Sequence, residues 1–207
     1  MKPWLCDILA CPIDKNFPLE LYIFSFETSE EQFKEILSVY ENRDINQILD
    51  EKIIEIQEEQ GTLYLKDDIV IEKSVIDLYL NSIISSINEV EHLHDKSSNK
   101  LSKRCFSIIT QDLKNKIVQF NEKRDLEKIE NIFPELYHLN KIKTEIEIKS
   151  GLLFCEECKR WYPIIETIPQ MLPDEYRDEK TEVEFLKTNK DLLDFTFFKQ
   201  NLKPFNI

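Results

Sequence analysis

Two cysteine-containing segments, far apart in the sequence, hold the side chains best suited to chemistry. The first includes Cys11, and the second has Cys155 and Cys158 separated by two glutamates. Each segment places a cysteine in or beside a tight turn, and an apolar, strand-like run follows it. The Cys155 and Cys158 spacing presents two thiolates across one turn, as tetrahedral zinc requires. Brought together, the two segments would form a site of the zinc-ribbon type, so both ends of the chain would belong to one small domain.

The composition limits the classes of protein to which this chain can belong. Its 207 residues suffice for one domain or two modest ones, and 42% apolar residues can form a core. The formal net charge is -13. That charge argues against autonomous nucleic-acid binding, because attraction to phosphates needs a basic face. The acidic surface serves either solubility or docking on a basic partner.

Glycine is scarce, which excludes one group of cofactors. The sequence has two glycines, Gly61 and Gly151. A loop that wraps the phosphates or ribose of a nucleotide or of adenosylmethionine usually needs several glycines within a few residues. We therefore expect that the chain does not bind those cofactors itself.

The cysteine count and the absence of long apolar runs bear on location. The start of the chain shows no secretory signal, and the longest apolar runs are too short for a membrane span. Five cysteines, an odd number, fit metal binding in a reducing compartment better than a disulfide framework. We expect a cytoplasmic protein with no membrane partner. Cys105, alone in a helical pattern, is expected to be a buried structural thiol.

Residues 1–28 and 144–173 have the pattern of a small antiparallel β domain. The first stretch predicts a short helix that ends at Pro12 and a strand over 17–26. The second predicts an alternating strand at 146–149, a turn at Ser150 and Gly151, and a strand at 152–154. A further strand follows over 161–165, and Pro163 places it at an edge of the sheet.

Residues 29–143 predict an inserted helical bundle, and residues 174–207 a C-terminal helix and tail, so the fold class is α+β. Ser29 and Gln32 form a capping box for the first helix. The remaining expected elements follow the chain in order: a helix over 44–60, a hairpin of 62–65 with 69–71, a helix capped by Ser74 that reaches Val90, and helices over 107–121 and 126–133, the last ended near Pro134.

The ordered set of motifs resembles the small activator subunit shared by tRNA, ribosomal-RNA and release-factor methyltransferases, in its archaeal form. The matching stretches are residues 9–15 with 17–19, then 151–158, then 161–164 with 168–173. The resemblance implies a zinc-ribbon-like domain interrupted by a helical domain. It also implies a non-catalytic subunit that activates and stabilises adenosylmethionine-dependent methyltransferases of tRNA, rRNA or translation factors. RNA would meet the chain only indirectly, through the complex.

The resemblance also implies a metal site whose fourth ligand stays open. Cys11 aligns with the first knuckle cysteine of the family, beside Cys155 and Cys158. Where members with a full site have a second cysteine, this chain has Asp14-Lys15-Asn16. Asp14 could supply an oxygen, or Cys6 could reach the site or simply pack in the first helix. Zinc on this set is the prediction; a metal-free ribbon and a partly occupied or redox-sensitive site are the alternatives.

An apolar strip after the last predicted strand is the candidate docking face. Such a strip either closes the small core or binds a partner by edge-strand pairing. The resemblance favours docking, with the methyltransferase adding its sheet beside this domain. The candidate partner-binding residues are Phe17, Pro18, Ile168, Pro169, Met171 and Leu172; for Phe17 the alternative is a place in the core.

Catalysis fits the sequence badly. The three histidines, His92, His94 and His138, lack the spacing of helical metal pairs and are expected on the surface. No nucleophile is recognisably paired with a base. A hydrolase or redox enzyme is therefore the weakest hypothesis. A zinc-ribbon nucleic-acid-binding adaptor is the main alternative, opposed by the net charge but helped by Lys159 and Arg160 beside the knuckle.

Overall fold

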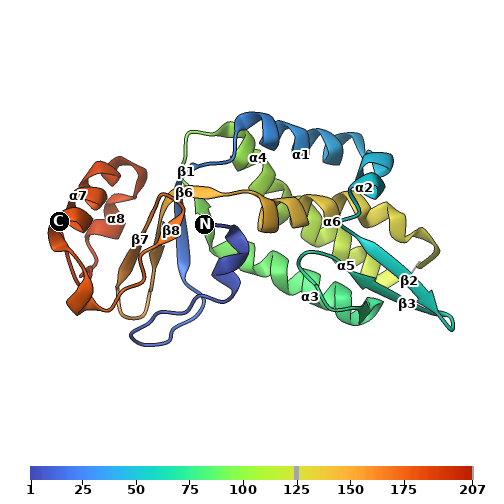
Figure 1. The fold of residues 1–207 in the computed structure, drawn as a ribbon, viewed down its shortest axis with the longest axis horizontal. Coiled ribbons are helices and arrows are strands. Elements are labelled where there is room, and N and C mark those ends of the chain that lie inside the picture. The colour runs from blue at the N-terminus through green and yellow to red at the C-terminus, as the bar shows by residue number, and fades with distance from the viewer. Residues whose placement is uncertain (124–125, 207) are drawn as a thin grey trace. The chain divides into compact units, whose positions relative to one another are not determined.

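The computed structural model describes residues 1–123 and 126–206 and divides into two compact units. Unit 1 comprises Met1–Glu27, His92–Asn99 and Glu147–Ile207, and unit 2 comprises Thr28–Glu91 and Lys100–Ile146. Positions 124 and 125, in the expected helical insertion, and position 207, in the expected tail, lie outside the described residues. The fold is mixed α+β, with a five-stranded sheet in unit 1 and a three-stranded sheet in unit 2 (Figure 1).

The sheet of unit 1 brings the start of the chain together with strands from its last third. Its strands lie in the order β5-β1-β6-β7-β8, with β1 and β5 parallel and the other pairs antiparallel. Leu21 of β1 pairs with Leu153 of β6, which pairs in turn with Tyr162 of β7. The strands are β1 (Glu20–Phe26), β5 (Leu93–Asp95), β6 (Ile148–Phe154), β7 (Trp161–Ile165) and β8 (Ile168–Pro169).

Gly151 lies inside β6, so the turn predicted at Ser150 and Gly151 is wrong. The strand runs without a break from Ile148 to Phe154. A Cβ atom at position 151 would lie 2.7 Å from the carbonyl oxygen of Tyr22 and 3.3 Å from Cδ1 of Ile164. Glycine is therefore needed here because the neighbouring strands approach closely, and not because the chain reverses.

Two other expectations for this sheet were wrong. Pro163 does not mark the edge strand, because β8 lies outside β7 and pairs with Ile164 and Ile165. The expected helical insertion included residues 92–99, but β5 joins the sheet by parallel pairing with β1. Three residues of β5 were too few to give a periodic signal in the sequence.

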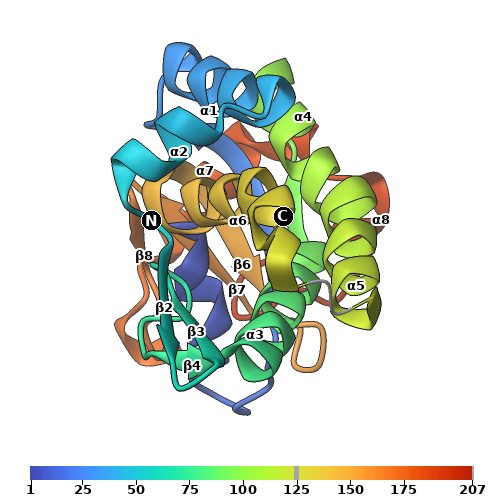
Figure 2. The same cartoon turned by 90° about the vertical axis from the view of Figure 1, so that its right-hand side faces the viewer.

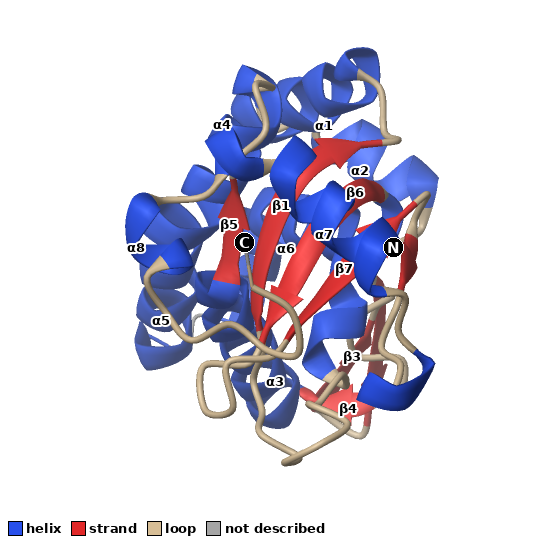
Figure 3. Ribbon diagram, turned by 90° about the vertical axis from the view of Figure 1, so that its left-hand side faces the viewer, coloured by secondary structure: helices blue, strands red, loops and turns tan. Residues whose placement is uncertain are grey.

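The C-terminal segment covers one face of this sheet. It contains a 3-10 turn (Asp174–Tyr176), helix α7 (Glu179–Thr188), a second 3-10 turn (Lys190–Leu192) and the short helix α8 (Phe195–Phe198). Figure 3 shows α7 across β6 and β7. Leu186 of α7 and Phe197 of α8 pack in one cluster with Phe154 and Trp161 of the sheet. Each such buried side chain contributes about 1.5–3 kcal/mol, so the segment forms part of the core of unit 1.

Arg177 fastens the segment to β7. Its guanidinium donates to the carbonyl oxygen of Trp161 at 2.7 Å and pairs with Glu182, and both side chains are buried. The same group lies 5.3 Å from the Trp161 ring centroid and 5.2 Å from that of Tyr162. A buried cation is tolerated here because it is paired and lies against aromatic faces.

Unit 2 consists of helices with a small sheet. Figure 2 shows β2, β3 and β4 beside α3. The capping box at Ser29 and Gln32 is confirmed. The main helices are α1 (Glu30–Asn42), α2 (Ile45–Glu51), α3 (Ile76–Glu89), α4 (Lys100–Ile108), α5 (Lys114–Lys123) and α6 (Phe133–Asn140). The strands are β2 (Glu55–Glu59), β3 (Thr62–Lys66) and β4 (Ser74–Val75).

The helix predicted over 44–60 is wrong in its second half, which forms strand β2. It ends at Glu51, because Lys52 adopts a left-handed conformation, and β2 then pairs with β3 across Gln60 and Gly61. Both turn residues have positive φ, as in the tight turns that join hairpin strands. The predicted hairpin partner at 69–71 is therefore wrong. Ser74 likewise lies in β4 and does not cap α3.

Two further helix boundaries differ from the prediction. The helix expected over 107–121 begins at Lys100 and continues through a π-helical segment (Ile109–Leu113) into α5. Residues Leu126–Ile132 form a 3-10 segment, and Pro134 lies in the first turn of α6 instead of ending a helix. Proline suits the first helical turn because its missing N–H has no partner there. A second π-helical segment, Lys141–Glu145, follows α6.

Candidate metal centre

The first cysteine knuckle is a tight turn closed by its own backbone. The amide of Cys11 donates to the carbonyl oxygen of Asn16 at 3.0 Å, and the amide of Lys15 donates to that of Cys11 at 2.9 Å. Lys15 has a φ of 63°, a left-handed conformation. The Asp14 carboxylate accepts from the amide of Asn16 at 3.0 Å. The turn therefore holds Cys11 and Asp14 in fixed positions.

The second knuckle repeats this geometry. The amide of Cys155 donates to the carbonyl oxygen of Arg160 at 2.8 Å, and the amide of Lys159 donates to that of Cys155 at 2.9 Å. Lys159 has a φ of 61°, and it follows Cys155 at the interval at which Lys15 follows Cys11. The two segments therefore share one backbone conformation, although within the turn their sequences match only at the cysteine and at the lysine four residues later.

Cys11, Asp14, Cys155 and Cys158 form a group that could hold a metal ion. One ligand atom from each residue lies within 4.8 Å of the other three. The sulfurs of Cys11 and Cys158 are 3.6 Å apart, and the Cys155 sulfur is 3.4 Å from Oδ2 of Asp14. Cys11 and Cys155 are buried, whereas Asp14 is exposed. The group is thus a half-buried cluster at the surface of unit 1.

These distances suit zinc. A Zn–S bond of about 2.3 Å in a tetrahedron places two sulfur ligands roughly 3.8 Å apart. The Cys11 and Cys158 sulfurs, 3.6 Å apart, are close to that separation, and all four ligand atoms lie within 4.8 Å of one another. Three thiolates and one carboxylate would more than neutralise the divalent ion, so the site as a whole would carry a net negative charge. The set therefore fits a closed, structural type of site without an open position for a substrate.

Without a metal, the thiols of Cys155 and Cys158 hold their protons firmly. Burial raises the pKa of Cys155 to about 12 and also raises the pKa of Cys158. Asp14 differs: the hydrogen bond from the Asn16 amide, with those from the thiols, lowers its pKa to about 2. Raised thiol pKa values oppose a nucleophilic or redox role, because the thiolate is the reactive form. A bound cation would instead stabilise the thiolates and release the protons.

Two contacts around the cluster were not found from the sequence. The hydroxyl of Tyr162 lies 3.3 Å from the Cys11 sulfur, which places a polar group of β7 beside the site. Arg160, next to the knuckle, forms an ion pair with Asp174 at 2.8 Å. Alternation along β7 could have pointed to Tyr162, but the pairing of Arg160 with Asp174 depends on the fold of the C-terminal segment.

The remaining cysteines lie apart from this group. Cys6 is buried in the N-terminal 3-10 turn (Pro3–Asp7) and is not a member of the cluster, so Asp14 is the fourth residue there. Cys105 is fully buried in α4, which confirms the expectation of a structural thiol.

The histidines differ from the expectation of three surface residues. His138 is fully buried in α6, and its Nε2 atom lies 3.0 Å from the carbonyl oxygen of Cys105. Burial lowers the pKa of His138 to about 4. His92 and His94 are half-buried, and each contacts one carboxylate oxygen of Glu20, at 2.7 Å and 2.6 Å. Glu20 lies at the start of β1, so the contact clamps β5 to β1.

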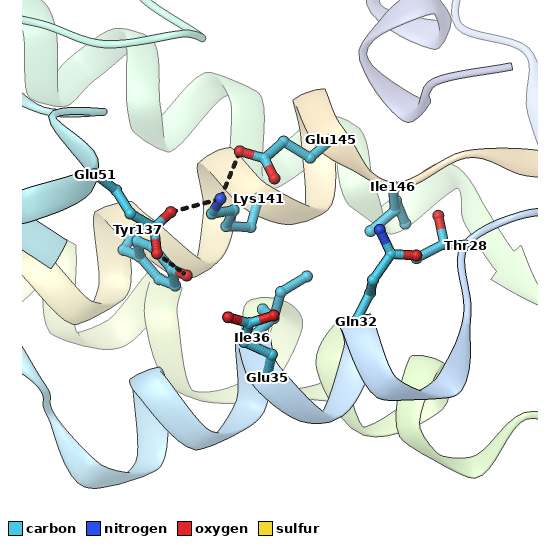
Figure 4. Close-up of a pocket in the computed structure, with 9 residues that line it drawn as sticks. All are labelled: Thr28, Gln32, Glu35, Ile36, Glu51, Tyr137, Lys141, Glu145 and Ile146. Atoms are coloured by element: carbon cyan, nitrogen blue, oxygen red, sulfur yellow. Dashed lines mark hydrogen bonds and ion pairs between the residues drawn. The ribbon is translucent and has the colours of Figure 1, made fainter. Parts of the chain in front are cut away.

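A cavity of about 230 Å3 in unit 2 lies among polar side chains (Figure 4). Lys141 forms ion pairs with Glu51 and Glu145, both at 2.6 Å, and Tyr137 donates to Glu51 at 3.1 Å. Burial alone would lower the pKa of Lys141, but the two carboxylates outweigh it and raise the pKa. Among the described residues that line the cavity there is no cysteine, histidine or serine.

The predicted partner-binding residues lie at or near the surface of unit 1. Ile168, Phe17 and Leu172 are exposed, Ile168 with 60% of its surface, while Pro18, Pro169 and Met171 are intermediate. Other large hydrophobic side chains of unit 1 that we did not select are also exposed: Trp4, Ile8, Ile13, Tyr176 and Phe195. The N-terminal turn that contains Trp4 lies close to β8 in Figures 1 and 2.

The fold and the cluster together define an α+β protein whose two chain ends meet at a candidate metal centre. Residues 2–166 match a family model described as Trm112p-like protein, and the chain belongs to this family. The family is known as one of non-catalytic activators of methyltransferases. No curated protein and no solved structure matches the chain. Within residues 1–123 and 126–206, no helix has both the length and the apolar character needed to cross a bilayer.

Proposed function

We propose that this chain is a non-catalytic subunit that activates and stabilises adenosylmethionine-dependent methyltransferases acting on tRNA, rRNA or translation factors. Its membership of an activator family supports the role, and the scarcity of glycine agrees with a chain that leaves adenosylmethionine to its partner. The proposed metal is zinc, held by Cys11, Cys155, Cys158 and Asp14. Its role would be structural, because the four residues leave no position for substrate.

The observation that carries the proposal is the apolar edge of the five-stranded sheet. The end strand β8 is two residues long, and it pairs with β7. Ile168 of β8 and Leu172, just beyond it, are both exposed. An exposed apolar edge strand is a template for pairing with another chain. We propose that a methyltransferase sheet adds there, and that Phe17, Pro18, Pro169 and Met171 complete the contact.

Docking of this kind explains activation by mass action. A subunit that binds only the folded methyltransferase stabilises that enzyme by about 2.7 kcal/mol when the free subunit is present at 100 times the Kd. The same contact covers apolar surface of the methyltransferase that would otherwise cause aggregation. The subunit therefore needs no catalytic group.

The alternative of a nucleic-acid adaptor built on the knuckle receives less support. It relied on Lys159 and Arg160 as a local positive site. Arg160 forms an ion pair with Asp174 and lies partly buried, so it contributes little free positive charge beside that knuckle.

The test uses a methyltransferase captured from native lysate, identified by mass spectrometry, and co-expressed with the chain. Methyl transfer from radiolabelled adenosylmethionine is measured for the enzyme alone, the chain alone and the complex. We expect activity from the complex, little from the enzyme alone and none from the chain. Ile168→Asp should abolish binding and activation, because it places a charge in an apolar contact.

Ile71→Asp is the matched control. Ile71 lies in unit 2 and has 77% of its surface exposed. The substitution therefore makes the same chemical change at an exposed isoleucine outside the proposed docking face. It should leave binding and activation unchanged. Normal activation by the Ile168→Asp variant, or methyl transfer by the chain alone, would contradict the proposal.

A further inference from the structure

The polar cavity of unit 2 combines charged side chains with apolar walls (Figure 4). Its volume is about 230 Å3, and α1, α2, α6 and the π-helical segment Lys141–Glu145 contribute to its lining. Ile36, Tyr137 and Ile146 are buried and supply aliphatic and aromatic surface. The cavity can therefore contact both the charged and the hydrocarbon parts of a small molecule.

The charged residues of the lining do not cancel. They are one cation, Lys141, and three carboxylates, those of Glu35, Glu51 and Glu145, so their net charge is -2. This sum includes every charged residue of the described chain that lines the cavity, whether or not it has a partner. The lining as a whole is therefore acidic.

The cations nearest in sequence to these residues do not offset the negative charge, because each has an acidic counterpart. The pairs are Lys34 with Glu31, which line an adjoining groove together, Lys52 with Asp50, on either side of Glu51, and Lys143 with Glu89, 3.1 Å apart. These neighbours therefore leave the net charge of the cavity unchanged.

Glu51 is the carboxylate whose charge is already compensated. Its Oε2 atom lies 2.6 Å from the ammonium group of Lys141. Its Oε1 atom accepts hydrogen bonds from the hydroxyl of Tyr137 at 3.1 Å and from the side-chain amide of Gln47 at 3.3 Å. Both oxygens of Glu51 therefore have partners, and its pair with Lys141 is neutral.

Glu35 and Glu145 carry the remaining two negative charges. Glu145 contacts Lys141 through Oε1 alone, at 2.6 Å. Within residues 1–123 and 126–206, no hydrogen bond or ion pair reaches Oε2 of Glu145 or either oxygen of Glu35. Figure 4 shows Glu35 extending from α1 and Glu145 from the segment after α6, on opposite sides of the cavity. Two separate carboxylates are thus available to a ligand.

The pKa values of neighbouring groups agree with a negative potential in the cavity. Burial raises the pKa of Tyr137, and the three carboxylates of the lining raise it further. The same potential stabilises the protonated form of Lys141, whose pKa is raised although burial opposes the change. A cationic ligand in the cavity would be stabilised for the same reason.

We propose that this cavity binds an aliphatic diamine, with one ammonium group on Glu35 and the other on Oε2 of Glu145. Two uncompensated carboxylates match two ammonium groups, and the buried Ile36 and Ile146 offer aliphatic surface to the methylene chain between them. A diamine with four carbons has six non-hydrogen atoms, which at no more than ~30 Å3 each take up about 180 Å3. A molecule of that size fits the cavity.

Other cations match the cavity less well. A monoamine or a sodium ion leaves one carboxylate uncompensated. A divalent metal ion takes about six oxygen ligands at once, whereas the two free carboxylates lie on opposite sides of a partly apolar cavity. The inference does not rest on the proposed function, because it concerns unit 2 and needs no methyltransferase.

Calorimetric titration of the full chain with putrescine, the four-carbon diamine, tests the assignment at a fixed ionic strength. Butylamine, with the same carbon chain and one ammonium group, is the matched ligand. Loss of one hydrogen bond between charged groups should weaken binding roughly tenfold or more, so butylamine should bind at least about tenfold more weakly than putrescine. Glu35→Gln should weaken putrescine binding by a similar factor.

Glu31→Gln is the matched control variant. Glu31 lies one turn before Glu35 on α1, is also exposed, and lines the adjoining groove instead of the cavity. The net charge changes by the same amount, and the affinity for putrescine should stay within about twofold of the wild type, because an exposed charge outside the contact is screened. Circular dichroism checks that each variant is folded.

Carbodiimide coupling in the presence of putrescine gives an independent measurement of position. The reaction joins an amine to a nearby carboxylate, and peptide mass spectrometry then locates the added diamine. We expect it on Glu35 or Glu145 and not on Glu31.

Four results would overturn the proposal. These are no saturable binding of putrescine at millimolar concentrations, equal affinity for butylamine, an equal loss of affinity in the Glu31→Gln variant, and coupling without preference for Glu35 or Glu145. Magnesium chloride is included as a competitor at the same ionic strength. If magnesium binds with the same dependence on Glu35 and displaces putrescine, the cavity is a site for a divalent cation and the diamine assignment is wrong.

Discussion

The buried histidine of unit 2 makes folding depend on pH in a way that can be calculated. His138 is fully buried, contacts the ring of Tyr40 at a tilt with centroids 4.9 Å apart, and lies with its Nε2 atom 3.0 Å from the carbonyl oxygen of Cys105. Its pKa falls from 6.5 to about 4 because burial disfavours the cation. The unfolded chain therefore takes up a proton as the pH falls through 6.5, while the folded chain stays neutral until about pH 4.

The sign and size follow from linkage. Between pH 6.5 and 4 the unfolded state binds more protons, so stability falls as the pH is lowered. The loss attributable to His138 is about 1.4 kcal/mol at pH 5.5 and about 2.5 kcal/mol at pH 4.5, relative to pH 8. Well above pH 6.5 both states are neutral and the effect vanishes.

His138→Gln isolates this contribution. The glutamine amide can still donate to the Cys105 carbonyl, but it does not titrate. Urea unfolding is followed by circular dichroism, because both tryptophans, Trp4 and Trp161, lie in unit 1 and would not report on unit 2. The free energy of unfolding of the wild type minus that of the variant should fall by about 2.5 kcal/mol from pH 8 to pH 4.5, since other groups titrate alike in both proteins. A difference that stays constant over this range would refute the argument.

Three more predictions concern the metal centre and the core of unit 1. Cys155→Ser should reduce the zinc content, measured by elemental analysis, to well below one equivalent and should lower the Tm. Cys105→Ser should keep the metal. Stoichiometric zinc in the Cys155→Ser variant would show that Cys155 is not a ligand. Gly151→Ala should cost about 1–3 kcal/mol in chemical denaturation, because its Cβ would lie 2.7 Å from a backbone oxygen; an unchanged midpoint would show that β1 and β6 can separate. Arg177→Leu should lower the free energy of unfolding by about 3–5 kcal/mol, because it leaves buried Glu182 unpaired. Recovery of stability in the Arg177→Leu, Glu182→Leu double variant would show that the unpaired charge is the cause. A loss of under about 1 kcal/mol in the single variant would contradict the argument.

The sequence by itself determined the features that depend on local spacing. Two cysteines across one turn predicted the second knuckle, and Ser29 with Gln32 predicted the start of α1. The apolar run from Trp161 predicted β7 with its observed bounds. These features follow from residues within a few positions of one another, whose chemistry is nearly independent of the rest of the chain.

Only the tertiary structure decided features that depend on distant neighbours. Gly151 has the local pattern of a turn, but the close approach of Tyr22 makes it the middle of a strand. His138 looked like a surface residue, yet packing in unit 2 buries it and lowers its pKa. Asp14 became a member of the cysteine cluster, in place of Cys6, because the first knuckle turns its carboxylate toward Cys155. Burial and electrostatics are sums over all neighbours in space, and a linear pattern does not contain those neighbours.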